Sequence, residues 1–174
     1  MELLKQVKTG THFVILALVL MSSSLFAQTP LMSVSSGASV TISSDNKLSI
    51  GGMNLAPTND YTITETVLSK SSTAAISGSE ESISRVYTLS TPQPNFSGTI
   101  EVRYEDSELN GNTEPALAAF SRPDSSASEW VEHSGSVDTN ENLIIGEALA
   151  NVTVGEITAA TSGTLTVKPI TSVF

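Results

Sequence analysis

The chain has 174 residues, with 8 basic and 18 acidic side chains and a formal net charge of -10 at pH 7. It contains no cysteine, which excludes disulfide frameworks, thiolate zinc sites and cysteine nucleophiles. The excess of acid argues against nucleic acid as a partner, because phosphate binding needs Lys and Arg to displace counterions. Apolar residues make up 39% and charged residues only 15%, so the composition supports a packed core rather than a disordered acidic tail.

The N-terminal segment has the order of a secretory signal peptide. Lys5 and Lys8 form a short positive region, the apolar run 13–21 follows, and small and apolar residues lead to Ala27. We expect cleavage after Ala27, which removes residues 1–27. The apolar run is about half of the roughly 20 residues that cross a bilayer, so we expect no membrane span in the mature chain.

Residues 28–60 follow, and they contain short apolar pairs spaced for hairpin strands: Val40 and Ile42, Leu48 and Ile50, Met53 and Leu55. The loose recurrence of these pairs also fits the start of a solenoid-like cap, but a β-solenoid needs about three repeats to be stable. We therefore expect N-terminal strands or hairpins here, with the cap as the minor alternative.

Three further segments alternate between apolar and polar residues, as half-buried β-strands do. They are 61–68 with Tyr61, Ile63 and Val67 on one face, 83–89 with Tyr87 and Leu89 on one face, and 97–105 with Ile100, Val102 and Tyr104 on one face. Between the second and third, the prolines of segment 91–95 predict a loop, because each proline removes a ladder donor.

The remaining elements are shorter. Segment 115–120 predicts at most one helical turn, and the apolar residues 143–145 and the pair Leu165 and Val167 predict strands. Four dipeptides predict tight turns, namely Gly51-Gly52, Asn110-Gly111, Ser134-Gly135 and Ser162-Gly163. The fold class is therefore all-β, a single antiparallel β-sandwich of about seven to nine strands, with residues 61–174 as the sandwich domain.

Three segments together carry a family resemblance. They are F-S-G-T-I-E-V-R-Y-E-D-S-E-L-N-G-N-T-E-P-A-L (Phe96–Leu117), Glu129-Trp130, and V-D-T-N-E-N-L-I-I (Val137–Ile145). This order resembles the immunoglobulin-like β-sandwich modules of large secreted and cell-surface proteins of Bacteroidetes. The resemblance implies an immunoglobulin-like sandwich with a structural role and no catalytic residues. That pattern also buries a tryptophan between the sheets, so we expect Trp130 in the core.

One acidic segment has the alternating oxygens of a calcium loop, with the candidate ligands Asp106, Glu108, Asn110 and Glu114. An EF-hand loop needs a glutamate at its twelfth position, which is Leu117 when the count starts at Asp106. The competing hypothesis is a plain acidic turn, in which Asp106 caps the turn and Asn110-Gly111 forms it. We expect the plain turn and name no cofactor.

His133 is the only histidine that remains after removal of residues 1–27. A serine–histidine–acid triad would need it, but Ser134 is too near in sequence and no G-x-S-x-G motif is present. We therefore expect His133 to be a surface residue at a strand end. A carbohydrate platform would need Trp130 exposed together with tyrosines, namely Tyr61, Tyr87 or Tyr104.

Two further motifs are weak. Asn95-Phe96-Ser97 and Asn151-Val152-Thr153 fit the N-glycosylation acceptor, a short pattern that is frequent by chance. Lys47, Lys70 and Lys168 are candidates for lysine–asparagine cross-links, although the sequence does not place an acid beside them.

The sequence thus predicts an exported, non-enzymatic structural or protein-interaction module of the bacterial cell envelope, secreted, on the cell surface or in the periplasm. We expect it to bind an envelope or surface protein through a sheet face or edge, including strand addition. The alternative is a small carbohydrate-binding or calcium-dependent adhesion domain.

Overall fold

A computed structural model describes residues 28–165, so the predicted signal peptide and Val167 lie outside the described residues. The described chain is all-β, with two single-turn 3-10 helices. In chain order the elements are β1 (Thr29–Val34), β2 (Val40–Ile42), β3 (Leu48–Ile50), β4 (Met53–Pro57), β5 (Tyr61–Ile63), β6 (Thr66–Ser71), β7 (Ile76–Ser77), β8 (Glu80–Glu81), β9 (Val86–Arg103), η1 (Asp106–Glu108), η2 (Glu114–Ala116), β10 (Leu117–Arg122), β11 (Val131–His133), β12 (Gly135–Asp138) and β13 (Leu143–Thr161).

All strand pairs of the described chain are antiparallel. Nine strands form the main sheet, while β2 with β5 and β7 with β8 form two small two-stranded sheets. This confirms the all-β, antiparallel part of the predicted fold class. The pairing does not contain two separate large sheets, so it leaves an immunoglobulin topology unestablished.

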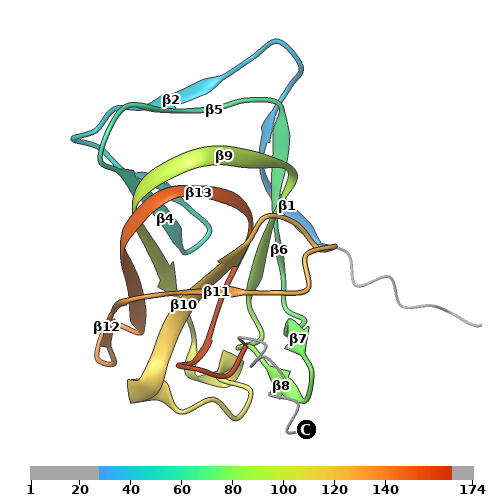
Figure 1. Cartoon of the computed structure of the whole chain (residues 1–174), viewed down its shortest axis with the longest axis vertical. Helices are drawn as coiled ribbons and strands as arrows, with labels where there is room; N and C mark the ends of the chain where they lie inside the picture. Colours follow the sequence, from blue (N-terminus) through green and yellow to red (C-terminus); the bar gives the residue numbers. More distant parts are fainter. Residues whose placement is uncertain (1–27, 166–174) are drawn as a thin grey trace, which may run out of the picture.

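Two long bent strands, β9 and β13, run through the whole main sheet and arch together (Figure 1). The first part of β9 and the last part of β13 join β1, β6, β10 and β11, in the order β1-β6-β9-β13-β10-β11. We call this part arm A. The other halves of β9 and β13 join β3, β4 and β12 and form arm B. The main sheet is therefore one sheet folded at the middle of its two central strands.

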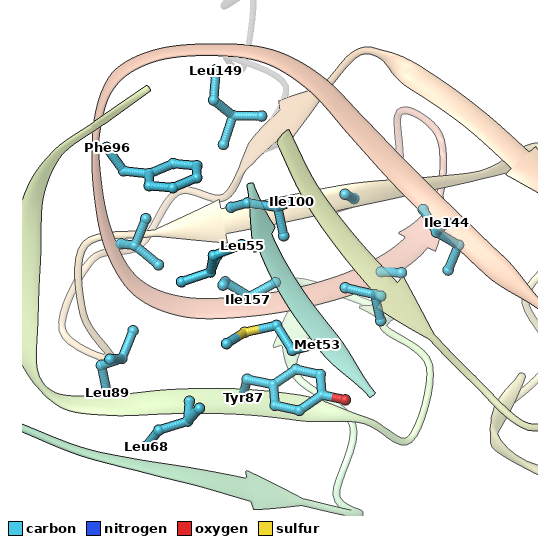
Figure 2. Packing of buried hydrophobic residues seen from close by; sticks show 14 of the residues in the cluster. Met53, Leu55, Leu68, Tyr87, Leu89, Phe96, Ile100, Ile144, Leu149 and Ile157 are labelled. Carbon is cyan, nitrogen blue, oxygen red and sulfur yellow. The ribbon is translucent and has the colours of Figure 1, made fainter. Parts of the chain in front are cut away.

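Side chains from both arms and from the bend fill one apolar core, which we call the main core (Figure 2). Arm B contributes Met53, Ile100 and Ile144, and arm A contributes Tyr87 and Ile157, all at most 1% exposed. The predicted inward face of segment 97–105 is confirmed, because Ile100, Val102 and Tyr104 are all buried. The alternation of the sequence thus places apolar side chains between the arms, where their burial stabilises the fold.

A second, smaller cluster lies on the opposite face of arm A and consists of Phe120, Trp130, Ala160 and Leu165, packed by Ala75 and Ala118. We call it the Trp130 cluster. Neighbouring residues of one strand point to opposite faces, and accordingly Ala119 belongs to the main core while Phe120 belongs to this cluster. Trp130 is buried as predicted, at 2% exposure, but it lies outside the core between the arms.

The predicted loop at 91–95 was wrong, because these residues lie inside β9. Here β9 pairs with β13, while β6 ends its pairing at Leu89 and β4 begins its own at Gly98. A proline has no backbone N–H, so it is tolerated in a strand where no neighbouring strand on that side needs a hydrogen-bond donor. The same stretch contains the bend, where Asn95 has φ 62° and Gly98 has φ 151°.

Gly98 is also required by close packing. A Cβ atom added there would lie 2.3 Å from the carbonyl oxygen of Ala56 and 2.7 Å from the Cα of Pro57. Only glycine lets the backbone of β9 approach β4 this closely while keeping a positive φ. The bend of the sheet therefore depends on this one residue type.

The single strand predicted at 61–68 is two strands, β5 and β6, which pair with different partners. Thr64 and Glu65 are both exposed between them, so the alternation changes phase. Thr66 and Leu68 point inward instead of Val67. Because the side-chain period of a strand is two, one extra residue reverses the faces of everything after it.

Two elements are longer than the sequence pattern indicated. Segment 115–120 supplies one 3-10 turn, η2, as predicted, but its later residues belong to strand β10. The predicted strand at 143–145 is only the beginning of the 19-residue β13. The rest of β13 has irregular register with β9, so it lacks the regular alternation that predicts strands.

Three of the four strands in segment 28–60 pair with strands of segment 61–174, and the fourth, β3, pairs with β4. β1 pairs with β6, β4 pairs with β9, and β2 pairs with β5.

Three of the four predicted turn dipeptides lie in turns, while Gly135 of the fourth lies in β12. Because Gly135 has no side chain, the backbones of β12 and β13 can approach closely, since a Cβ at this position would lie 1.7 Å from the carbonyl oxygen of Ile145.

Candidate functional site

The four candidate calcium ligands lie in and around η1 and η2, and each contacts a different protein group. The Asp106 carboxylate accepts a hydrogen bond from Asn142 Nδ2 at 2.7 Å, and Glu114 accepts one from the Tyr104 hydroxyl at 2.8 Å. Asn110 donates from Nδ2 to Glu81 at 2.8 Å and to the carbonyl oxygen of Ser82. These oxygens are therefore distributed among several contacts rather than gathered around one point.

Glu108 is the most strongly bound of the four. Its carboxylate accepts two hydrogen bonds from Arg85, from Nε at 2.7 Å and from Nη2 at 2.9 Å. It also accepts one from the backbone N–H of Glu105, which completes a capping box at η1. The Arg85–Glu108 pair ties the η1 turn to the residue directly before β9. Bidentate pairs of this kind add geometric specificity as well as interaction energy.

Within residues 28–165, no group of three or more His, Asp or Glu side chains is arranged to hold a metal ion. A calcium ion at Asp106, Glu108, Asn110 and Glu114 remains a prediction that receives no support from this geometry. Glu105 and Glu108, rather than Asp106, cap the η1 turn. Asn110 and Gly111 form a turn as expected, whereas Glu114 binds the Tyr104 hydroxyl.

His133 corrects a prediction, because it lies at the end of strand β11 as expected but is buried, at 7% exposure. Its Nε2 lies 2.8 Å from the hydroxyl of Ser121, which is also buried. Burial lowers the pKa of His133 below its ordinary value of 6.5, since charging a buried imidazole loses solvation. The sequence could not reveal this pair, because β10 and β11 become neighbours only in the folded sheet.

The aromatic residues of the described chain are all buried, and none provides a surface platform. They are Tyr61, Tyr87, Phe96, Tyr104, Phe120 and Trp130. Tyr61 packs edge to face against Phe96 at a centroid distance of 5.1 Å. Arg122 covers Trp130, with its Cζ 4.4 Å from the ring centroid. The condition set for a carbohydrate platform, an exposed Trp130 beside tyrosines, is therefore not met in residues 28–165.

The structure does place an acid beside one of the candidate lysines. Lys47 Nζ lies 3.2 Å from Glu101 Oε2, and Asn54 Nδ2 donates to the same oxygen at 2.5 Å. The Lys47 side chain is 52% exposed, and a solvated ammonium is a poor nucleophile. We interpret this trio as a surface ion pair and hydrogen bond that join the residue before β3 to β4 and β9.

The two glycosylation motifs meet at the bend of the main sheet. Asn95 and Asn151 are both exposed and both have positive φ. The backbone N–H of Asn151 donates to the hydroxyl of Ser97, which belongs to the other motif. Their place is therefore explained by the geometry of the bend, since asparagine tolerates positive φ better than most residues.

The edges of the main sheet are the remaining candidate sites, and they differ in length and charge. β1 is a six-residue edge strand with no charged side chain. The edge strands β3 and β11 have three residues each, β11 includes Glu132, and the four-residue β12 includes Asp138. Proteins protect edges by short strands, charges, proline and bulges. β1 has only Pro30 and a register shift before Met32.

A shallow hollow of about 230 Å³ lies beside β1 and is lined by Gln28, Pro30, Val67, Ser69, Thr88 and Ser90. Gln28 reaches across to β6, where Ser69 Oγ donates to its Oε1 at 2.7 Å. Strands were expected in segment 28–60, but none at the position of β1. Its only available indication was the uncharged, partly apolar run directly after the predicted cleavage site.

No protein-family model matches the chain, and no curated protein or solved structure matches it. In the described residues, no helix is both long enough and apolar enough to cross a membrane.

Proposed function

We propose that the chain is an exported, non-enzymatic structural or protein-interaction module of the bacterial cell envelope or surface. Export is supported by the order of charge, apolar run and small residues in 1–27. A non-enzymatic role is supported by the engagement of the polar candidates in structural contacts and by the burial of Ser121 and His133.

We also propose that the chain is an immunoglobulin-like module. The antiparallel all-β architecture and the two arms that enclose one core support this. The residues that carry the resemblance lie in the second part of β9, in η1 and η2, directly before β11, at the end of β12 and at the start of β13. A structural role follows from the family, and no catalytic residue is transferred from it.

The observation that carries the interaction role is the edge strand β1. It is the longest edge of the main sheet in residues 28–165, and its six residues carry no charge. An extended segment of a partner can add to such an edge through main-chain hydrogen bonds. We propose that β1 docks a strand of an envelope or surface protein.

The test introduces a charge on this edge and compares it with a matched control. Ser33→Lys places a lysine at an exposed position of β1, and Ser49→Lys does the same on the edge strand β3. Proteins captured from an envelope extract should be lost with Ser33→Lys and retained with Ser49→Lys, provided that both variants keep the wild-type urea midpoint. Equal capture by both would contradict docking at β1.

Carbohydrate binding and calcium-dependent adhesion receive no specific support. The buried aromatics and the engaged acids offer neither a stacking surface nor a set of converging oxygens within residues 28–165.

A further inference from the structure

Opposite charges flank the two ends of the edge strand β1, which borders the main sheet beside β6 (Figure 1). At one end Thr29 pairs with Lys70 of β6, and at the other end Val34 pairs with Thr66, which directly follows Glu65. In residues 28–165 neither Lys70 nor Glu65 belongs to an ion pair. The uncharged edge therefore lies between one positive end and one negative end.

The exposure of the side chains in the middle of β1 reads the same in both directions along the strand. Pro30 and Ser33 are exposed, whereas Leu31 and Met32 between them are half-buried and pack against the main core. This order arises because the register with β6 shifts between Pro30 and Met32, so that Leu31 is an extra residue in the strand. A regular strand alternates between its faces and lacks this symmetry.

The symmetry of β1 allows the strand to pair with a second copy of itself. Residues directly opposite each other in two antiparallel strands have their side chains on the same face of the sheet. A twofold axis between Leu31 and Met32 places Pro30 opposite Ser33 of the second copy, and Leu31 opposite Met32 of the second copy. Exposed side chains then lie beside exposed ones, and half-buried side chains lie beside half-buried ones.

The charges favour β1 over the other edges and favour the antiparallel orientation. A contact with twofold symmetry uses the same surface twice, so it doubles every charge on that surface. At the edges β11 and β12 it would bring together Glu132 or Asp138 of both copies, in a protein whose net charge is already -10. At β1 it brings Lys70 of each copy to the end that holds Glu65 of the other, whereas a parallel arrangement would align like charges.

We propose that the strand that docks on β1 is β1 of a second copy of this chain, antiparallel to it and related by the twofold axis between Leu31 and Met32. The inference rests on the proposed docking at β1 and names its partner. Main-chain hydrogen bonds between the copies complete the open edge of each, and the two copies of arm A become one continuous sheet. Because each copy uses the same surface, the contact closes as a dimer.

The first experiment tests the register by disulfide cross-linking in a chain that has no cysteine of its own. Pro30→Cys combined with Ser33→Cys, exported with its own residues 1–27 and then oxidised, should give a covalent dimer on a non-reducing gel. Each single variant should stay monomeric on the gel, because the two copies of one position lie more than about 10 Å apart, beyond the reach of a disulfide. A mixture of the two single variants should again give covalent dimers.

The second experiment tests the charges by analytical ultracentrifugation at about 0.01 M salt, where the Debye length is about 30 Å. Lys70 and Glu65 of the second copy lie three strand spacings apart, about 14 Å. Glu65→Lys should raise the dissociation constant of the dimer about fourfold, because two attractions become repulsions, even though it reduces the net charge. Adding Lys70→Glu restores both attractions and the original net charge, and should restore the wild-type constant.

The outcomes separate self-pairing from the proposed function. A wild type that sediments as a monomer, or that dimerises without the predicted cross-links, overturns self-pairing. Docking at β1 then still stands if Ser33→Lys loses the proteins captured from the envelope extract, and it falls as well if capture is unchanged. A tighter dimer with Glu65→Lys would show that net charge alone controls association, and it would overturn the antiparallel contact. Glu65 is exposed between β5 and β6, so this variant leaves the main core intact.

Discussion

The main core and the Trp130 cluster use opposite means of stabilisation on the two faces of arm A. The main core is large and apolar, and it is enclosed by both arms. The Trp130 cluster has four buried members and is covered by charge, because Arg122 lies over the indole and binds Glu156 from Nε at 2.6 Å. The difference indicates that apolar burial determines the fold, whereas paired charges protect a smaller apolar surface on its outer face.

The largest expected effect is a cavity in the main core. Ile100→Ala removes a fully buried side chain of β9 in arm B and should lower the free energy of unfolding by about 4 kcal/mol. Urea denaturation followed by circular dichroism measures it. Val131→Ala, at an exposed position, should change stability by no more than about 0.5 kcal/mol. A similar loss in both variants would contradict the distinction between core and surface.

Removing the charge that covers the Trp130 cluster should have the next largest effect. Arg122→Ala leaves the Glu156 carboxylate buried without its charged partner and should cost about 3 kcal/mol. It should also shift the emission of Trp130, the only tryptophan, to longer wavelength.

Two variants control this prediction. Arg103→Ala breaks an exposed pair with Glu141 and should cost less than about 1 kcal/mol. Adding Glu156→Gln to Arg122→Ala should recover part of the lost stability, because the unpaired buried charge is then gone. Failure of this recovery would show that Arg122 acts through its packing on Trp130 alone.

The pH dependence of stability should reveal the buried His133, which lies on the same face of arm A as Ala119 of the main core. Its pKa is lowered by burial from an ordinary value of 6.5, so the unfolded chain binds the proton more readily. The contribution is present in full above pH 6.5 and is lost as the pH falls toward the lowered value. The urea midpoint of the wild type should therefore fall between pH 7.5 and 5.5, and His133→Asn should reduce that fall. If the urea midpoint falls equally in the wild type and in His133→Asn, the fall is caused by the carboxylates and not by His133.

Local patterns predicted the elements whose strands are regular, and they failed where the sheet bends. Segment 97–105 was predicted correctly because one uninterrupted alternation faces one core. Pro92 and Pro94 indicated a loop, since no local rule shows that β6 and β4 leave that side of β9 unpaired. His133 and the edge strand β1 depend on pairing between distant segments, and that information is absent from any short window.

The smallest expected effect compares two buried tyrosines of the main core. The Tyr61 hydroxyl is buried with no hydrogen-bond partner in residues 28–165, and burial raises its pKa to about 12. Tyr61→Phe should therefore be neutral or stabilise the protein by up to about 1 kcal/mol, because an unpaired buried hydroxyl is removed. Tyr104→Phe should instead destabilise by about 1 kcal/mol, since the Tyr104 hydroxyl donates to Glu114.

The same pair extends the contrast to alkaline pH. A folded-state pKa above the ordinary value of 10 means that stability from the neutral Tyr61 is complete below pH 10. It declines as the pH rises from 10 toward about 12, because the unfolded chain loses its proton first. Tyr61→Phe should weaken this alkaline decline in the urea midpoint. If Tyr61→Phe and Tyr104→Phe instead destabilise equally at neutral pH, the Tyr61 hydroxyl has a partner in solution, and the main core is less purely apolar than its packing indicates.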